Sequence, residues 1–402
     1  WSSDVCSSDL LIAVSSAYEM WQLTDIHFDA NYVPGSDPNT VCREGNGSAR
    51  PIGDYLCDTT KEVMDSAADF VTLHSSALQH NRLLLYNGDI LPRKLGDYDM
   101  AYLEEGLENA TEFLRKFTRF EIIPMLGNHD AIPENYHDAS KTELYLYAAN
   151  AYNRWLTPDA RYTFKKGGFY TKPIVSVGED NLYVVVLNTV LYYTFNALTA
   201  NDTDPIGQFA WFKETMDKYR EQKATVLLAA HICPGVSERY NWSDQMYDQY
   251  DDRLIDMIAE YDDVIAGMFC GHLHLDTYRI MQSKDKKKAV IGYMSPSLDT
   301  YLGVNPSIRK YKISGKKVKN YINYYVDLNQ TSVQWKLNYN ACEEYGIPDV
   351  TAPNMIQLAQ RMHEDDELHS KWYEHLRADS HMYSCDALCK NNNLCSIEHP
   401  RN

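Results

Sequence analysis

The chain has 402 residues, a formal net charge of −18 at pH 7 and a pI near 5.1. This length suits one large domain or two smaller ones. The acidic balance argues against duplex nucleic acid as a partner, although a single cleft can still be basic enough for a small phosphate-bearing substrate. Because no run of 18 apolar residues occurs, we expect no transmembrane span.

Residues 1–17 are predicted to lie outside the folded protein. Residues 1–10 are rich in Ser and Asp and resemble an assembly scar, that is, a leftover segment foreign to the protein. Residues 10–17 resemble the remnant of a signal peptide. A short apolar run followed by small residues is typical of a cleavage site, which places the mature N-terminus at about Tyr18. The alternative for residues 10–17 is an ordinary buried strand.

The first half of the chain alternates strands and helices. Compact apolar runs predict strands over 18–23, 83–86 and 122–126. Apolar residues at helical spacing predict helices over 58–80, 98–118 and 138–156. A turn-rich loop bounded by cysteines covers 29–57.

The second half continues this alternation of strands and helices and then ends in several strands and a helical tail. Strands are predicted over 182–187, 225–230, 264–270, 289–294, 308–313, 318–328 and 333–337. Helices are predicted over 206–222, 250–261 and parts of the tail from 353 onward. This order predicts one α/β domain, with either one mixed sheet or two packed sheets, covered by helices. We expect a division into a main domain, 18–340, and a helical C-terminal subdomain, 341–402.

Sequons and clustered cysteines indicate a glycoprotein that is secreted or resides in the lysosomal lumen. The five N-x-S/T sequons are at Asn46, Asn109, Asn201, Asn241 and Asn329. The disulfide candidates are Cys42 with Cys57 and Cys385 with Cys389. Cys270 follows an apolar run and is predicted to be a buried thiol.

Polar turns with metal-binding side chains follow five of the predicted strands. They are Asp25-x-His27, Gly88-Asp89, Gly127-Asn128-His129-Asp130, His231 and Gly271-His272-x-His274. Because the carboxyl ends of strands gather at one edge of an α/β sheet, we expect these turns to meet in one crevice. Extended residues at i and i+2 point to the same side, so each D-x-H or H-x-H pair would face the same site.

These side chains suggest a site for two metal ions. Oxygen and nitrogen ligands without a thiolate suit Zn, Mn or Fe. Two carboxylates, an amide and several imidazoles exceed the three or four ligands of one tetrahedral zinc, so two ions fit better than one, with Asp89 as the bridge. Each motif alone is as well explained by an ordinary turn or helix cap. The ordered set of five favours the dimetal interpretation.

The order D-x-H, GD, GNH[DE], H, GHxH resembles the signature of the calcineurin-like metallophosphoesterases. Over roughly residues 18–400 the chain is most similar to their acid sphingomyelinase-like phosphodiesterase branch. The resemblance implies two packed mixed β-sheets flanked by helices (an αββα sandwich), a helical C-terminal subdomain with a disulfide, and a metal-dependent phosphoric diester hydrolase. Purple acid phosphatases have a Tyr ligand three residues after the Gly-Asp aspartate, and Pro92 at that position argues against their iron–tyrosine site.

The resemblance also implies two Zn²⁺ ions, with Mn or Fe less favoured. The ligands of the first ion would be Asp25, His27, Asp89 and His274. The ligands of the second ion would be Asp89, Asn128, His231 and His272. A hydroxide bridging both ions would then attack phosphorus in line, without a covalent enzyme intermediate.

Three further residues are predicted to be catalytic. His129 would protonate the leaving group or stabilise the transition state, with Asp130 orienting it. The branch usually has a second catalytic His four residues after the Gly-Asp aspartate, where this chain has Arg93. The Ser/Thr phosphatase branch has an Arg at that offset, so Arg93 is predicted to bind substrate phosphate. A guanidinium cannot replace His as a proton donor near neutral pH.

The resemblance supports phosphodiester and pyrophosphate substrates, which include nucleotides, nucleotide-linked alcohols and sphingomyelin. The acidic surface, and the lack of a lipid-presenting domain before the first motif, favour soluble nucleotide-type substrates over lipid. Loop aromatics are predicted either to stack a base or to pack inside: Tyr192, Tyr193, Tyr240, Trp242 and Tyr247. The alternatives are a sphingomyelin phosphodiesterase and a weakly active extracellular binding protein in which Arg93 marks decayed catalysis.

Overall fold

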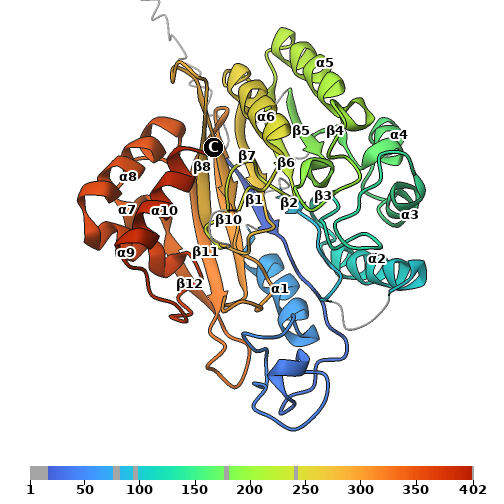
Figure 1. Cartoon of the computed structure of the whole chain (residues 1–402), viewed down its shortest axis with the longest axis vertical. Coiled ribbons are helices and arrows are strands. Elements are labelled where there is room, and N and C mark those ends of the chain that lie inside the picture. The colour runs from blue at the N-terminus through green and yellow to red at the C-terminus, as the bar shows by residue number, and fades with distance from the viewer. Residues whose placement is uncertain (1–16, 76–81, 94–97, 176–180, 240–242, 401–402) are drawn as a thin grey trace, which may run out of the picture.

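The computed structural model describes residues 17–75, 82–93, 98–175, 181–239 and 243–400. Two six-stranded mixed β-sheets pack against each other, and helices cover the outside of the sandwich (Figure 1). The strand order is β12-β11-β10-β1-β2-β3 in the first sheet and β4-β5-β6-β7-β9-β8 in the second. The fold class implied by the resemblance is therefore confirmed.

The strands fall into two groups along the chain. The first sheet contains β1 (Tyr18–Leu23), β2 (Arg82–Tyr86), β3 (Glu121–Pro124), β10 (Ser307–Ser314), β11 (Lys317–Val326) and β12 (Trp335–Asn340). The second sheet contains β4 (Tyr170–Pro173), β5 (Leu182–Leu187), β6 (Thr225–Ala230), β7 (Ile265–Cys270), β8 (Thr277–Gln282) and β9 (Ala289–Met294). The run β1-β2-β3 is parallel, and so is β5-β6-β7, so each run ends on one edge of its sheet.

Two strands were not predicted from the sequence. Strand β4 has four residues and ends in Pro173, which leaves too short a run for a periodic signal. Strand β8 is buried at its first five positions, so its sequence shows no alternation between polar and apolar residues. Both strands pair antiparallel with a neighbour that was predicted, β4 with β5 and β8 with β9.

Five of the described α-helices begin with a side-chain cap. The helices are α1 (Lys61–Leu73), α2 (Met100–Arg115), α3 (Glu143–Ala151), α4 (Pro158–Gly167), α5 (Gln208–Glu221), α6 (Asp248–Glu260), α7 (Ala341–Tyr345), α8 (Ala352–Glu364), α9 (Asp366–His375) and α10 (Ala387–Glu398), with short 3-10 turns η1 (Pro38–Thr40), η2 (Thr189–Tyr192) and η3 (Pro205–Gly207). The predicted helix 138–156 is shorter than expected, and α4 was missed. The side chain of Thr157 accepts a hydrogen bond from the backbone N–H of Ala160, and Pro158 occupies the first turn, which is a typical helix start.

The core between the sheets is aromatic, with polar links near the strand ends. The rings of Phe269 on β7 and Tyr311 on β10 meet edge to face, with centroids 5.0 Å apart. The side chain of Gln22, on β1, donates to the carbonyl of Cys270 at 2.9 Å. Because both groups are buried, this hydrogen bond fixes the end of β7 against β1.

The C-terminal helices pack beside β8 of the second sheet and β11 and β12 of the first (Figure 1). Helices α8 and α10 contact β8, and α7 contacts β11 and β12. A disulfide joins Cys385 to Cys389 at the start of α10, with Cα atoms 5.3 Å apart. The division at residue 340 stays a prediction, and the predicted scar and signal remnant lie almost wholly outside the described residues. Among those residues, no helix combines the length and apolar character needed to cross a membrane.

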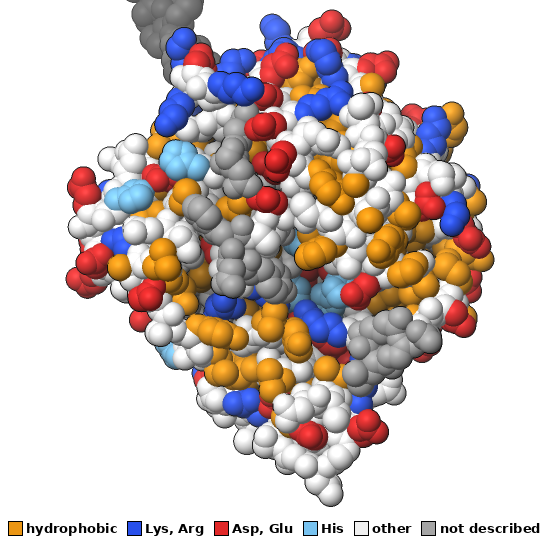
Figure 2. Space-filling view, in the orientation of Figure 1, with side chains coloured by type: hydrophobic (Ala, Val, Ile, Leu, Met, Phe, Trp, Pro, Cys, Tyr) orange, Lys and Arg blue, Asp and Glu red, His pale blue; other side chains and the backbone are white. Residues whose placement is uncertain are grey.

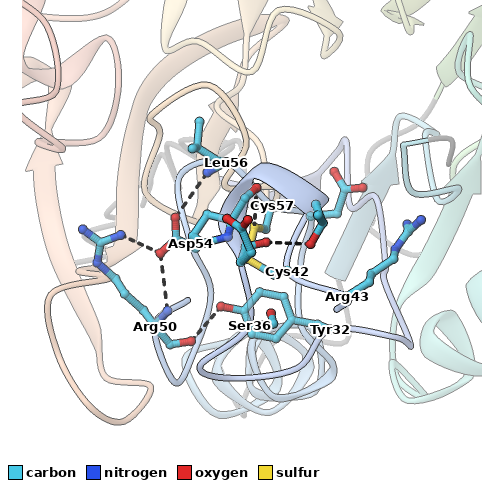
Figure 3. The surroundings of a disulfide bond; sticks show 12 residues. Tyr32, Ser36, Cys42, Arg43, Arg50, Asp54, Leu56 and Cys57 are labelled. Atoms are coloured by element: carbon cyan, nitrogen blue, oxygen red, sulfur yellow. Dashed lines mark hydrogen bonds and ion pairs between the residues drawn. A yellow bond between two sulfur atoms is a disulfide. The ribbon is translucent and has the colours of Figure 1, made fainter. Parts of the chain in front are cut away.

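The loop before α1 is cross-linked by a second disulfide, between Cys42 and Cys57 (Figure 3). Beside it, Arg50 forms an ion pair of 2.8 Å with Asp54, and the hydroxyl of Tyr32 donates to the carbonyl of Arg50 at 2.6 Å (Figure 3). These contacts order a segment whose regular structure is limited to the short 3-10 turn η1. Its last residues lead directly to the functional edge of the sandwich.

Candidate metal centre

The residues predicted as metal ligands meet at one edge of the sandwich, and each sheet supplies part of the set. Turns after β1, β2 and β3 carry Asp25, His27, Asp89 and Asn128. Turns after β6 and β7 carry His231, His272 and His274. The carboxyl ends of both parallel runs therefore converge on one site, as expected for α/β sheets.

These side chains form two clusters that meet at Asp89. The first cluster is Asp25, His27 and His274, and the second cluster is Asp89, His231 and His272; within each cluster the ligand atoms lie within 4.8 Å of one another. Asp89 Oδ2 lies 3.7 Å from His27 Nε2 and 3.1 Å from His231 Nε2, between the clusters. Asn128 Oδ1 joins the second cluster, 2.9 Å from His231 Nε2 and 2.8 Å from His272 Nδ1.

Five of the seven predicted ligands have left-handed backbone conformations, which help to direct their side chains into the site. The φ values are +49° at Asp25, +45° at His27, +58° at Asp89, +69° at His272 and +59° at His274. Residues other than glycine rarely adopt such values, and backbone strain of this kind gathers at functional sites. The expectation of extended D-x-H and H-x-H pairs is wrong, because both pairs lie in tight turns beyond the strand ends.

Glycine allows two of these turns to touch. Gly88 has a φ of +89°, and a Cβ there would overlap the backbone of Gly127. A Cβ on Gly127 would in turn overlap the carboxylate of Asp89. The glycines of the Gly-Asp and Gly-Asn-His motifs are therefore needed for the close approach of their turns.

Asn87 links the two sheets at the site. Its side-chain amide donates to the carbonyls of Ala230, at 2.8 Å, and Phe269, at 3.0 Å, which belong to the second sheet. Its own backbone carbonyl lies 2.7 Å from His231 Nδ1. One buried residue of the first sheet thus positions a ligand of the second, which no sequence motif indicated.

The histidine rings are oriented through their second nitrogen. His27 Nδ1 lies 2.7 Å from the carbonyl of Leu91, just as His231 Nδ1 lies 2.7 Å from that of Asn87. With a proton on Nδ1, each ring directs the lone pair of Nε2 into the clusters. Within the described part of the chain, the buried Nε2 of His27 has no hydrogen-bond partner.

The protonation of the clusters suits divalent metal. Burial lowers the pKa of His27 well below its ordinary value. Although burial opposes it, His274 and His231 hold the pKa of Asp25 below the usual range. His231 differs, because Asp89 and Asp25 raise its pKa to about 9 although burial opposes this. Neutral imidazoles and ionised carboxylates are the forms that bind metal, so a bound ion would have to displace the proton of His231. With that proton released, these residues fit a centre of two ions.

Arg93 lies among carboxylates that were not predicted to belong to the site. Its guanidinium pairs with Asp58 and Asp299, with Nη1 2.6 Å from Asp299 Oδ2, and stacks on the ring of Tyr301 at 4.1 Å. Asp299 Oδ2 also lies 3.2 Å from Nδ1 of His274. The arginine is thereby connected to the first cluster. Neither aspartate has a motif around it that could have indicated this.

His129 has a different partner from the one predicted. Its Nδ1 lies 3.1 Å from Glu134 Oε2, and its backbone N–H donates to Asp89 Oδ1 at 2.8 Å. Asp130 accepts hydrogen bonds from the backbone N–H groups of Asp89 (2.8 Å), Ile90 (2.9 Å) and Gly127 (2.9 Å). The prediction that Asp130 orients His129 is wrong, because these amides hold its carboxylate. Although burial opposes it, Asp89 and Glu134 raise the pKa of His129.

A disulfide joins the end of β7 to the turn that follows β6, close to the histidines that the second sheet supplies. Cys233 lies two residues after His231, and Cys270 lies two residues before His272, with Cα atoms 5.6 Å apart. The prediction that Cys270 is a thiol is wrong, because the pairing of β6 with β7 brings Cys233 beside it.

A cavity of about 560 Å³ opens over the clusters, and its walls include Arg93, Arg239, His129, Glu134 and Tyr193. Figure 2 shows histidine, basic and acidic side chains gathered near the middle of this face, with hydrophobic ones around them. A second cavity, of about 530 Å³, shares His129 and Glu134 with the first and is otherwise lined largely by apolar residues such as Leu91 and Ile132.

The aromatic residues proposed for base stacking lie in different environments. Tyr193 lines the cavity, with its ring edge to face with that of His272 at 4.9 Å. Tyr192 is buried and stacks on Phe209, so it belongs to the core. Tyr240 and Trp242 lie outside the described residues.

Two protein families match the chain. Residues 19–276 match the calcineurin-like phosphoesterases. Residues 292–400 match the acid sphingomyelin phosphodiesterase C-terminal region. The first match includes all the residues predicted as metal ligands, and the second includes helices α7 to α10.

Curated relatives are similar along nearly the whole chain. Human cyclic GMP-AMP phosphodiesterase SMPDL3A is 30% identical over 402 residues, which cover 94% of this chain and 87% of that protein. Sphingomyelinase phosphodiesterase C of Dictyostelium discoideum is 28% identical over 411 residues, which cover 95% and 90%. A solved structure, calcineurin-like phosphoesterase YfkN from Bacillus subtilis, is 12% identical with a TM-score of 0.35, covering 89% of this chain and 99% of that one. A likeness that distant supports no inference.

Proposed function

The chain belongs to the calcineurin-like phosphoesterase family, and from that premise we propose that it hydrolyses phosphodiester or pyrophosphate bonds of nucleotides or nucleotide-linked alcohols. It is a phosphoric diester hydrolase with an acid sphingomyelin phosphodiesterase C-terminal region. One relative is named for cyclic GMP-AMP and another as a sphingomyelinase. The names of the relatives point to two different substrate classes, so the choice between these classes must come from the cavity of this chain.

The observation that carries the proposal is the pair of ligand clusters that meet at Asp89 beneath a cavity open to small molecules. We propose that the first cluster, with Asp89, holds one Zn²⁺ and that the second, with Asn128, holds another. Two such ions polarise a bound phosphoryl group and lower the pKa of water. Mn or Fe could bind the same nitrogen and oxygen ligands, but zinc is the metal that we propose.

His129 is the proposed proton donor for the leaving group. It lines the cavity, and its Nδ1 lies 3.1 Å from Glu134, which leaves Nε2 to carry the proton that is transferred. Its backbone N–H is tied to Asp89, so the ring is held at a fixed distance from the proposed bridge. Asp130 acts indirectly in this proposal, by holding the backbone of both turns.

Arg93 is proposed to bind a phosphate oxygen of the substrate. It lines the cavity, and its planar fork suits phosphate geometry. Asp58 and Asp299 hold the guanidinium in place, which reduces the entropy lost when substrate binds. Because Arg93 stands where the family resemblance implies a second catalytic His, proton transfer in this chain would rest on His129.

A sphingomyelin-type substrate is the second candidate, and one observation favours it. The second cavity shares His129 and Glu134 with the metal cavity and is also lined by Leu91, Ala131 and Ile132, so an apolar leaving group has room beside the proposed proton donor. Nucleotide-type substrates fit the basic side chains of the first cavity better, because Arg93 and Arg239 both line it.

We also propose that the protein is secreted or lysosomal and that it is glycosylated. Asn46, Asn201 and Asn329 are exposed, and Asn109 is half-buried. The sequon at Asn241 lies outside the described residues. The three disulfides suit an oxidising compartment. The proposed division remains a catalytic domain, 18–340, with a subdomain, 341–402.

A substrate panel tests the proposal. Bis-p-nitrophenyl phosphate is assayed with and without a chelator, beside ATP, a cytidine-diphosphate alcohol and sphingomyelin micelles. We expect chelator-sensitive hydrolysis, with kcat/KM highest for a nucleotide substrate. Preference for the micelles would support the lipid hydrolase instead. Binding of nucleotides without hydrolysis of any substrate would support the binding protein.

A further inference from the structure

The segment after β9 crosses from the second sheet to the first beside the ligand turns. Strand β9 runs parallel to β7, so its carboxyl end lies at the edge where the ligands gather. The N–H of Ser295 donates to the carbonyl of Cys270, at the end of β7, at 3.0 Å. Four residues later, the N–H of Asp299 donates to the carbonyl of Asp25 at 3.0 Å. These hydrogen bonds place Asp299 inside the metal centre, although it belongs to none of the predicted motifs.

The carboxylate of Asp299 is buried and faces two partners with one oxygen. Its Oδ2 lies 2.6 Å from Nη1 of Arg93 and 3.2 Å from Nδ1 of His274. The other ring nitrogen of His274, Nε2, lies 3.3 Å from Oδ1 of Asp25, which belongs to the first cluster. The imidazole of His274 therefore stands between two carboxylates, with Nε2 towards the cluster and Nδ1 towards Asp299.

His274 differs from two of the other ligands in the group behind its ring. Nδ1 of His27 and Nδ1 of His231 each lie 2.7 Å from a backbone carbonyl, whereas Nδ1 of His274 faces a carboxylate. Among the described residues, Nδ1 of His274 and Oδ1 of Asp299 are buried without an aligned hydrogen bond, so both groups gain if the pair aligns. A carboxylate behind a ligating imidazole fixes its tautomer and orientation and makes it a better metal ligand.

Asp58 provides an internal comparison for Asp299. It is also buried, pairs with the same Nη1 of Arg93 and accepts a hydrogen bond from the backbone N–H of Arg93 at 2.6 Å. Within the described part of the chain, its ion pair is with Arg93, and the carboxylate beside His274 is that of Asp299. Arg93 keeps one carboxylate when the other is removed, so either substitution leaves its charge compensated. The two aspartates thus share one role, at Arg93, and differ in the contact with His274.

We propose that Asp299 is a positioning residue of the metal centre, which orients His274 through Nδ1 and ties this ligand to Arg93 through the same oxygen. The inference rests on the proposed two-ion centre and deepens it. Because Arg93 is the proposed phosphate ligand, the shared carboxylate sets the place of the substrate phosphate relative to the first cluster. A displacement of about 1 Å at such a position can cost roughly 100-fold in rate.

The first test measures metal affinity. Zinc is titrated calorimetrically into the metal-free forms of the unchanged protein, Asp299→Asn and Asp58→Asn. We expect Asp299→Asn to bind one of the two ions roughly 10-fold to 100-fold more weakly and Asp58→Asn to bind both about as the unchanged protein does. Equal affinities in the two variants would overturn the proposal. Should Asp299→Asn not fold, Asp299→Glu keeps the charge beside Arg93 while altering the contact with Nδ1, and it should show the same weakening; full retention of affinity would again overturn the proposal.

The second test is spectroscopic, because a merely structural role of Asp299 would leave the environment of a bound ion unchanged. Cobalt replaces zinc at saturating concentration, and its visible absorption reports on the ligands. The bands of one ion should shift in Asp299→Asn and stay in place in Asp58→Asn. Identical spectra of Asp299→Asn and the unchanged protein would contradict the assigned role.

Hydrolysis of bis-p-nitrophenyl phosphate, measured on the same zinc-loaded samples, separates this inference from the proposed function. If the unchanged protein binds two ions and hydrolyses nothing, the enzymatic proposal fails, and weaker zinc binding by Asp299→Asn alone still supports the role of Asp299. If it hydrolyses the substrate and both variants bind zinc equally, only the role of Asp299 fails. If it binds no zinc, the two-ion centre and the role of Asp299 fail together.

Discussion

His129 and Glu134 form a pair in the cavity wall whose nitrogen and oxygen atoms lie 3.1 Å apart. A carboxylate in this position selects the tautomer of the imidazole and stabilises its protonated form. Glu134 stands five residues further along the chain, after a turn with a cis Ile132-Pro133 bond. No helix or strand relates the two residues, so sequence spacing alone could not pair them.

We predict that His129→Ala lowers kcat by roughly 10²–10⁴ while metal content stays near two ions per chain. Glu134→Gln should lower kcat by roughly 10-fold to 100-fold, in line with residues that orient a reacting group. In the double variant, the loss should be close to that of His129→Ala alone, because Glu134 acts through the imidazole. Steady-state kinetics with metal analysis checks this. Loss of a metal from His129→Ala would contradict the assigned role.

His137 is a buried histidine beside the metal-bearing turns. Its Nε2 lies 3.2 Å from the carbonyl of Gly127, and its Nδ1 lies 3.1 Å from the side-chain nitrogen of Asn188. Burial lowers the pKa of His137 from 6.5 to about 4. The unfolded chain therefore takes up a proton at a higher pH than the folded protein does.

The consequence is a loss of stability in acid. The contribution of His137 is fully present above pH 6.5 and declines as the pH falls towards 4, in total by about 3 kcal/mol. We predict that His137→Gln, although less stable near pH 7.5, loses less unfolding free energy between pH 7.5 and 4.5 than the unchanged protein. Denaturant titrations at both pH values check this, with His363→Gln, an exposed histidine on α8, as the control. An identical pH dependence in both variants would exclude His137 as the cause.

At the scale of elements, the sequence predicts the strand ends well and the turns beyond them poorly. Apolar runs such as Thr225–Ala230 carry a clear signal, so the edge at which the motifs gather followed directly. The left-handed φ values at His27 and His274 have no such signal, because tertiary contacts impose them on residues that rarely adopt them. Partners such as Asp299 and Arg239 come from distant segments without a motif. Their place in the site depends on packing that periodicity does not encode.

The disulfide between Cys233 and Cys270 ties the end of β7 to the turn that follows β6, both of which lead into ligand turns. Because His231 and His272 stand two residues from its cysteines, the bond restricts how far the two ligands can separate. The disulfide Cys385–Cys389 closes a loop of only a few residues at the start of α10, and neither cysteine is near a ligand in sequence.

We predict that the double variant Cys233→Ala, Cys270→Ala loses about 2–4 kcal/mol of unfolding free energy. It should also bind the second zinc ion more weakly, because His231 and His272 are less well held. The matched control is Cys385→Ala, Cys389→Ala, which should keep both ions. Denaturant unfolding and zinc content after dialysis against a weak chelator are the measurements. Equal zinc retention in the two double variants would mean that the bond serves stability alone.

At the scale of the molecule, the site lies across the junction of the two sheets. Ligands from the turns after β1, β2 and β3 face ligands from the turns after β6 and β7. Ions bound between them would contact both sheets in the folded state and neither in the unfolded state. Metal binding and the packing of the sheets are therefore thermodynamically linked.

We predict that removing the metal lowers the Tm by about 5 °C or more and that added Zn²⁺ restores it in a concentration-dependent manner. Each site contributes about 2.7 kcal/mol of stability when free metal is at 100 times its Kd. Differential scanning calorimetry of chelator-treated protein across a zinc titration checks this. Asp89→Asn should reduce the dependence of Tm on zinc, since it weakens the proposed bridge. A Tm independent of zinc in the unchanged protein would argue against ions that join the sheets.

The order of the ligands along the chain also has a consequence for synthesis. Asp25 and His274 are 249 residues apart, so at roughly 5–20 residues per second the ribosome makes the last ligand about 10–50 s after the first. Until residue 231 has been made, the nascent chain presents Asp25, His27, Asp89 and Asn128 without any histidine from the second sheet. The first sheet is itself incomplete until β10, β11 and β12 have emerged. Metal ions held between the two sheets could therefore be bound only near the end of translation, so we expect metal loading to fall among the last steps in the maturation of this protein.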